Sequence, residues 1–97
     1  MDFKEAVSLK VKRASDAPCY LCGRAAVQRH HIVGGSGKRK SCETQYSRLY
    51  LCFNCHEMIT NNYAESLKLK LLLQDLYFEL GHTGDEVRRL MGGKIYG

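Results

Sequence analysis

The chain has 97 residues, 44% of them hydrophobic, and its 15 Lys and Arg against 10 Asp and Glu give a formal charge of +5. This length predicts a single domain, whose modest core would gain from a staple such as a metal ion. No apolar run approaches the roughly 20 residues that span a bilayer, and nothing resembles a signal peptide, so we expect a cytoplasmic protein without a membrane partner. The basic excess is compatible with nucleic acid as a partner but does not prove it.

Residues 1–17 are predicted to form an N-terminal helix. Phe3, Val7 and Val11 recur at a four-residue spacing, which places them on one face of a helix. Pro18 favours an extended conformation at the residue before it and therefore ends this segment.

Four of the five cysteines form two Cys-x2-Cys pairs, which are Cys19 with Cys22 and Cys52 with Cys55. In a reducing compartment this pattern predicts a metal site rather than disulfides. Four thiolates bind Zn²⁺ tetrahedrally, whereas iron–sulfur clusters usually have other cysteine spacings. Bound zinc adds two positive charges and its thiolates four negative ones, so the formal charge would fall from +5 to +3. Cys42 lies outside the pairs and is expected to be an ordinary free thiol.

Residues 25–33 have an extended pattern and carry His30 and His31. Adjacent side chains of a strand point to opposite faces, so these two histidines cannot share one role from a regular strand. Residues 34–45 are rich in glycine and polar residues and are predicted to form a long loop, of the kind that is often functional.

Residues 48–51 are predicted to form a second strand, and residues 53–62 a short helix with His56 in its first turns. Strand, loop, strand and helix, held by the two cysteine pairs, make a ββα unit over residues 18–62. The predicted fold class is therefore α+β, a small zinc-stapled ββα core with flanking helices.

Residues 63–97 are predicted to be a helical extension. Residues 64–81 make the clearest helix, ended by Gly81, and the capping box from Thr83 to Glu86 begins a last one. An apolar stripe at helical spacing, which we assign to the core or to docking of a protein partner or second copy, consists of Leu69, Leu72, Leu73, Leu76 and Leu80.

Cys-x2-Cys, His-His-Ile and Leu-Cys-x2-Cys-His resemble the zinc-bracketed HNH endonucleases, which have the ββα-metal (His-Me finger) fold. The resemblance covers residues 18–62, and the glycine-rich end of the chain is more loosely similar to small phage-encoded HNH proteins. It implies a DNA endonuclease in the cytoplasm of a bacterial or phage-infected cell.

The resemblance also implies roles for single residues. His31 would be the general base that activates water, and His30 and His56 would bind a catalytic divalent metal such as Mg²⁺, Mn²⁺ or Ni²⁺. Ser47 stands where the family has an Asn that steadies the loop of the base. Thr60 stands where many members have a further histidine ligand.

A basic triplet in the loop, Lys38, Arg39 and Lys40, is expected to hold the DNA backbone on either side of the cut, with a solvated loop as the alternative. Two other functions remain open at this point. One is a non-catalytic zinc module that binds nucleic acid or protein, which Ser47 and Thr60 favour. The other is a nuclease that is active only with a partner docked on the leucine stripe.

Overall fold

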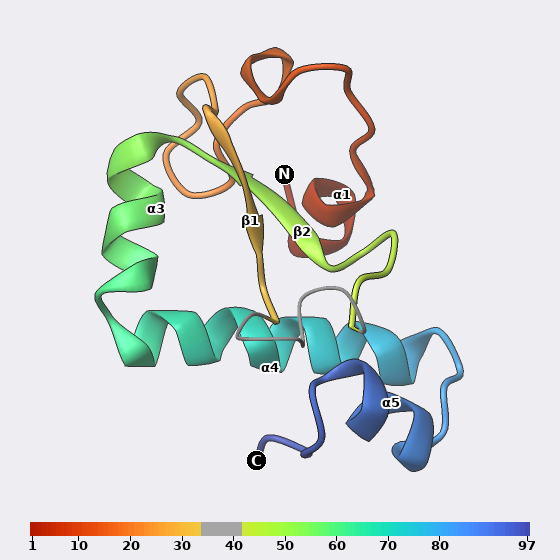
Figure 1. Ribbon diagram of the computed structural model, residues 1–97. Helices are drawn as coiled ribbons and strands as arrows, with labels where there is room; N and C mark the ends of the chain where they lie inside the picture. The colour runs from red at the N-terminus through yellow and green to blue at the C-terminus, as the bar shows by residue number, and fades with distance from the viewer. Residues whose placement is uncertain (34–41) are drawn as a thin grey trace.

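The computed structural model describes residues 1–33 and 42–97, which form a small α+β fold with a two-stranded antiparallel sheet and helices around it (Figure 1). The elements follow one another as α1 (Phe3–Ser8), the short 3-10 helix η1 (Ala14–Asp16), β1 (Gln28–His31), β2 (Arg48–Leu51), α3 (Phe53–Thr60), α4 (Tyr63–Glu79) and α5 (Gly84–Leu90). The predicted order of strand, strand and helix is confirmed. No helix in these two ranges is both long and apolar enough to span a bilayer.

The two strands pair in a register that assigns their side chains to two faces. His30 lies opposite Leu49, and His31 lies opposite Arg48. Cross-strand partners share a face, so the core face carries Gln28, His30, Leu49 and Leu51. The other face, here called the His31 face, carries Arg29, His31, Arg48 and Tyr50. The prediction that the two histidines point to opposite faces is therefore confirmed.

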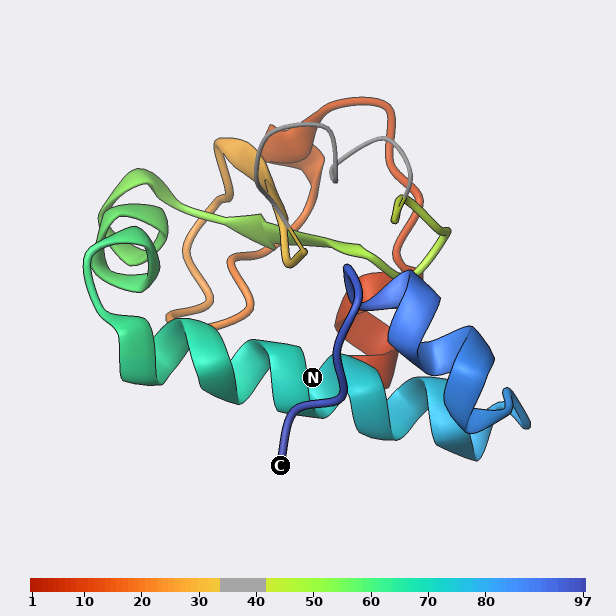
Figure 2. The same ribbon diagram turned by 60° about the horizontal axis from the view of Figure 1, so that its bottom comes forward.

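The main hydrophobic core lies between the core face of the hairpin and the helices. Leu49 and Leu51 are fully buried there, against Ile59 of α3 and Leu73 of α4. Figures 1 and 2 show that α4 runs along one side of the hairpin, that α3 joins the hairpin to α4, and that α5 packs on the C-terminal half of α4. The helices thus cover one face of the sheet and leave the His31 face for a smaller apolar cluster.

The N-terminal helix is shorter than the sequence predicts. Asp2 and Glu5 form a capping box at its start, but the helix ends at Ser8 and Leu9 is extended. The prediction of a helix through residue 17 is wrong because Leu9, Val11 and Ala14 pack instead on the small cluster of the His31 face. Burial of these side chains outweighs the helix propensity of the segment, because tertiary packing overrides propensity.

The predicted strand over residues 25–33 is also longer than the one observed, β1 at Gln28–His31. Ala25 pairs with Pro18 in an isolated antiparallel bridge instead of extending β1.

Gly81 ends α4 and a capping box begins α5, as the sequence predicts. After α4, Gly81 has a φ of +96°, and the amides of Gly81 and His82 donate to the carbonyls of Phe78 and Tyr77. This is the Schellman arrangement, in which a glycine adopts a left-handed conformation that is strained for other residues. Thr83 and Glu86 form the predicted capping box at the start of α5.

The leucine stripe of α4 is only partly buried. Leu69, Leu73 and Leu76 lie in the core, whereas Leu72 and Leu80 are each 39% exposed. Leu80 is the C-cap of α4 and lies outside its regular turns. A partner on this helix would therefore meet Leu72 and Leu80 rather than the whole stripe.

Candidate metal centre and active site

The first cysteine pair lies in a tight turn that several backbone hydrogen bonds close. The amide of Cys19 donates to the Arg24 carbonyl, and the amide of Gly23 donates to the Cys19 carbonyl at 2.9 Å. Gly23 has a φ of +80°, which a residue with a side chain rarely adopts. A bond from the Tyr20 amide to the Tyr50 carbonyl, 3.1 Å long, fixes this turn against β2.

The second pair lies where β2 ends and α3 begins. Cys52 is the N-cap of α3, and its Sγ accepts from the amide of Cys55 at 3.5 Å. The N-terminus of a helix carries unpaired amides and a partial positive charge, both of which favour a thiolate. The fold thus places two ligands from a turn and two from a helix start around one point.

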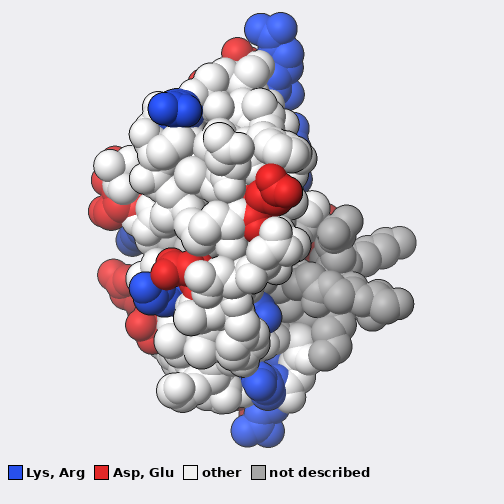
Figure 3. All heavy atoms as spheres, turned by 90° about the vertical axis from the view of Figure 1, so that its left-hand side faces the viewer, with Lys and Arg blue, Asp and Glu red and all other residues white. Residues whose placement is uncertain are grey.

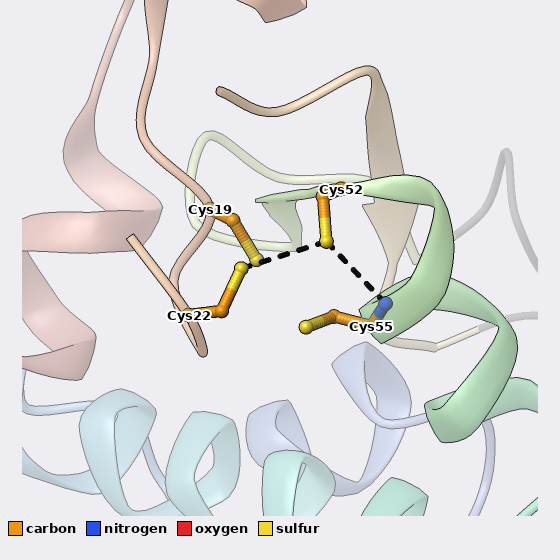
Figure 4. Close-up of side chains that lie close together, drawn as sticks. All are labelled: Cys19, Cys22, Cys52 and Cys55. Atoms are coloured by element: carbon orange, nitrogen blue, oxygen red, sulfur yellow. Dashed lines mark hydrogen bonds between the residues drawn. The ribbon is translucent and has the colours of Figure 1, made fainter. Parts of the chain in front are cut away.

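The four sulfur atoms converge as a zinc site requires (Figure 4). All four Sγ atoms lie within 4.8 Å of one another, and the Sγ atoms of Cys22 and Cys52 are 3.6 Å apart. Zinc–sulfur bonds of about 2.3 Å place the sulfurs of a tetrahedral site about 3.8 Å apart, close to these distances. The four cysteines therefore form a cluster that can hold a structural zinc ion.

Electrostatics inside the cluster favour a bound cation. Burial raises the pKa of Cys19, but amides of Cys52, Cys22 and Leu21 donate to its sulfur and lower that pKa to about 6. Burial and the neighbouring sulfurs raise the pKa of Cys55. Four thiols this close together do not all ionise by themselves, because their negative charges would repel one another. A divalent cation at the centre offsets this repulsion.

Cys42 lies outside this cluster, as the sequence predicts. It is 3% exposed, and its Sγ donates to the Arg89 carbonyl of α5 at 3.5 Å.

The second candidate metal site is formed by His30 of β1 and His56 of α3. Their rings meet edge to face with centroids 5.2 Å apart. Two imidazoles that bind one metal through nitrogens about 2.1 Å away have centroids about 4.5–5.3 Å apart, a range that includes the spacing of this pair. Because Cys52 and Cys55 begin α3, the cysteine cluster also fixes the position of His56.

The histidine pair has no third protein ligand of the usual kinds in the described ranges, where only the four cysteines form a set of three or more His, Cys, Asp or Glu ligands. Thr60, the predicted further ligand, donates its hydroxyl to the His56 carbonyl at 2.8 Å. Its oxygen keeps lone pairs, but its proton is used within the helix. A metal on His30 and His56 would fill its remaining positions with water or substrate oxygens, as Mg²⁺ usually does.

His31 has a carboxylate partner that the sequence does not indicate. Its Nε2 lies 3.3 Å from Oε1 of Glu43, and the same oxygen lies 3.9 Å from Nε of Arg48. His31 is partly exposed, with 23% of its side chain accessible, so a water molecule can reach it. If Nε2 donates to Glu43, then Nδ1 is left as the proton acceptor.

Ser47 is buried and fixes the turn that brings Glu43 to His31. Its hydroxyl accepts from the Thr44 amide and donates to the Thr44 carbonyl, both at 2.9 Å. Its carbonyl accepts from the amide of Ile32, the residue after His31. Ser47 thus makes hydrogen bonds to the residue after Glu43 and to the residue after His31.

The charged residues of the predicted site are only partly described. Lys38, Arg39 and Lys40 lie outside the described residues. On the face formed by α3, Figure 3 shows basic and acidic side chains interspersed on a mostly uncharged surface. Glu43 and Arg48 are the site residues that sequence reasoning missed, and only the register of the hairpin, which sets His31 opposite Arg48, could have indicated one of them.

No model of a protein family matches the sequence, and no curated protein or solved structure matches it either. A functional assignment therefore depends on the geometry of the cysteine cluster and the histidines.

Proposed function

We propose that this protein is an HNH-type endonuclease that hydrolyses phosphodiester bonds in DNA with a divalent metal ion. The observation that carries the proposal is the contact between His30 and His56, whose ring centroids lie 5.2 Å apart, with His56 on the helix that Cys52 caps. His31 follows His30 in the chain but points to the other face of the hairpin, where its ring contacts the Glu43 carboxylate. This division gives two histidines for a metal and one for a proton.

Each histidine has a distinct task in the proposed reaction. His30 and His56 bind Mg²⁺, Mn²⁺ or Ni²⁺, which when bound supplies charge stabilisation at the leaving 3′ oxygen. His31 removes a proton from a water molecule that is in line with the phosphorus. Glu43 keeps the imidazole in one tautomer and orientation, in the way that a third group orients the base of a catalytic triad.

Because of the position of β1, side chains from both faces of the hairpin can reach the same phosphate. Among the described residues the sheet has two strands, so β1 pairs with β2 along one edge only. A phosphate along the other edge of β1 can meet His30 from the core face and His31 from the opposite face. Both side chains are partly accessible, as this approach requires.

The test is the metal dependence of plasmid nicking. Zinc-loaded protein should convert supercoiled plasmid to the open circle when Mg²⁺, Mn²⁺ or Ni²⁺ is added and should be inactive without them. His30→Ala and His56→Ala should each raise the metal concentration needed for half-maximal activity. Equal metal dependence in both variants and the wild type would reject the histidine pair as the metal site.

A non-catalytic zinc module that binds nucleic acid is the second candidate. Two observations favour it. The Thr60 hydroxyl donates its hydrogen bond to the His56 carbonyl. In the described ranges, no third His, Cys, Asp or Glu ligand lies beside the histidine pair. This candidate predicts DNA binding but no nicking with any of the three metals. The plasmid assay and a binding assay on the same preparation separate the two functions.

A further inference from the structure

A small basic cavity lies between the end of α1, the segment after it and the His31 face of the hairpin. Its volume is about 80 Å³, several times the roughly 10–15 Å³ that one water molecule requires. Apolar side chains of residues 7, 9 and 11 form part of its wall. The polar lining, which includes no acidic residue, consists of Lys10, Arg29, Gln45, Arg48 and Tyr50.

The cavity has more positive charge than its surroundings neutralise. Lys10 Nζ donates to the Gln45 carbonyl at 2.7 Å, and Arg48 shares Glu43 at 3.9 Å with His31. Arg29 has no ion pair with any residue in the ranges 1–33 and 42–97. Burial and the nearby charge of Arg48 lower the pKa of Lys10. Three cationic residues therefore line one cavity that has no acidic residue in its lining, an arrangement that a bound anion would relieve.

We propose that this cavity is a phosphate-binding subsite, in which Lys10, Arg29 and Arg48 hold a backbone phosphate of the DNA strand that is cut at His31. Guanidinium groups bind phosphate oxygens with two parallel hydrogen bonds, and an ammonium adds a point charge. Inorganic phosphate has the same chemistry, so the choice of DNA as the source rests on the proposed nuclease function.

The register of the hairpin places this subsite next to the proposed base. Arg48 is the cross-strand partner of His31, and Arg29 lies on the same face two residues before it. Strand residues two apart are about 6.6 Å from each other, so the cavity adjoins the place of the attacked phosphate. Contacts of this kind position a strand without reading its sequence.

The test measures DNA affinity as a function of salt. A short fluorescein-labelled DNA, single-stranded and duplex, is titrated with wild type, Arg29→Gln and Lys10→Gln without added divalent cation, and binding is followed by anisotropy. Each variant should bind DNA more weakly than the wild type, and the loss of affinity should be similar for DNA of unrelated sequences. The slope of log affinity against log salt should fall by about 0.9 for duplex and about 0.7 for single strands, the value of one lost phosphate contact.

Two controls separate this effect from a general loss of charge or fold. Lys68→Gln removes a charge on α4 that pairs with Glu65, and it should keep the wild-type slope. Arg29→Lys keeps the charge and should restore most of the affinity. Zinc content and thermal unfolding of every variant should match the wild type, since Lys10, Arg29 and Lys68 are all exposed.

Two results would overturn the subsite. One is wild-type affinity and salt slope in both Arg29→Gln and Lys10→Gln. The other is Arg29-dependent binding of inorganic phosphate, seen as shifts of the arginine side-chain NMR signals, with no effect of Arg29→Gln on DNA. Because the readout is binding, a wild type that never nicks plasmid would reject the nuclease and leave an Arg29-dependent DNA subsite intact.

Discussion

Oε1 of Glu43 lies 3.3 Å from Nε2 of His31, although the two residues are 12 apart in the sequence. An extended chain of that length spans about 40 Å. The turn fixed by Ser47 brings the carboxylate to the imidazole. A carboxylate at one ring nitrogen fixes the tautomer and orientation of the other, which is what a general base requires. Glu43 is therefore a positioning residue in the proposed reaction.

Replacement of Glu43 should slow the reaction without weakening substrate binding. Glu43→Ala should lower kcat for plasmid nicking by about tenfold or more and leave KM nearly unchanged, because the carboxylate orients the base and does not bind DNA. Glu43→Gln keeps an acceptor and should retain more activity than Glu43→Ala. Steady-state kinetics would measure this, with Glu79→Ala on α4 as the matched control. If both Glu43 variants raised KM and left kcat unchanged, Glu43 would not have this role.

Zinc should be bound at one ion per chain and should be required for the fold. Cys55→Ala should lose the ion and its cooperative unfolding transition, because a structural zinc site supplies much of the folding free energy of a small domain. Metal analysis and thermal unfolding would measure both effects. Cys42→Ala is the matched control, since Cys42 is buried outside the cluster, and it should keep the zinc. Full zinc content in Cys55→Ala would contradict the four-cysteine site.

Acid should release this zinc. A released thiol binds a proton with an ordinary pKa of about 8.5, whereas a coordinated thiolate binds none. The zinc-free chain therefore binds more protons, so stability rises with pH and is lost as pH falls. A zinc indicator should report release as pH is lowered from neutral to about 5. Zinc release that does not change over this range would exclude four thiolate ligands.

Gln74 should anchor the C-terminal tail to α4. This buried side chain accepts from the amide of Tyr96 and donates to its carbonyl, both at 2.7 Å. Gln74→Leu would leave both backbone groups of Tyr96 without these partners, at a cost of about 1–3 kcal/mol in the free energy of unfolding. Hydrogen exchange should show faster exchange of the Tyr96 amide. Protection of this amide at the wild-type level would show that the tail is held by other contacts.

Local signals in the sequence predicted much of the fold. The bounds of β2 and the capping box at Thr83 were correct because short-range rules decide them. The end of α1 was not predictable, because Val11 leaves the helix to pack on residues that come later in the chain. Leu72 could not be assigned to the surface from spacing alone, since its exposure depends on how α4 is rotated against the hairpin.

The candidate site was predictable where it depends on spacing and not where it depends on a turn. Two Cys-x2-Cys pairs indicate four ligands for one ion, and the four Sγ atoms do converge. The alternation of a strand separates His30 from His31. The contact of Glu43 with His31 depends on the turn that Ser47 stabilises, and no pattern in the sequence specifies it.

His31 removes a proton from the attacking water in the proposed hydrolysis of DNA. The most direct measurement is the rate at which zinc-loaded protein nicks supercoiled plasmid with Mn²⁺, compared between wild type, His31→Ala and His82→Ala. His82 lies after α4, away from the cysteine cluster and bound to Glu86 at 3.8 Å, so it is the matched control. We predict that His31→Ala lowers the rate by about a hundredfold or more and that His82→Ala keeps it. Equal rates for the wild type and His31→Ala would contradict the account.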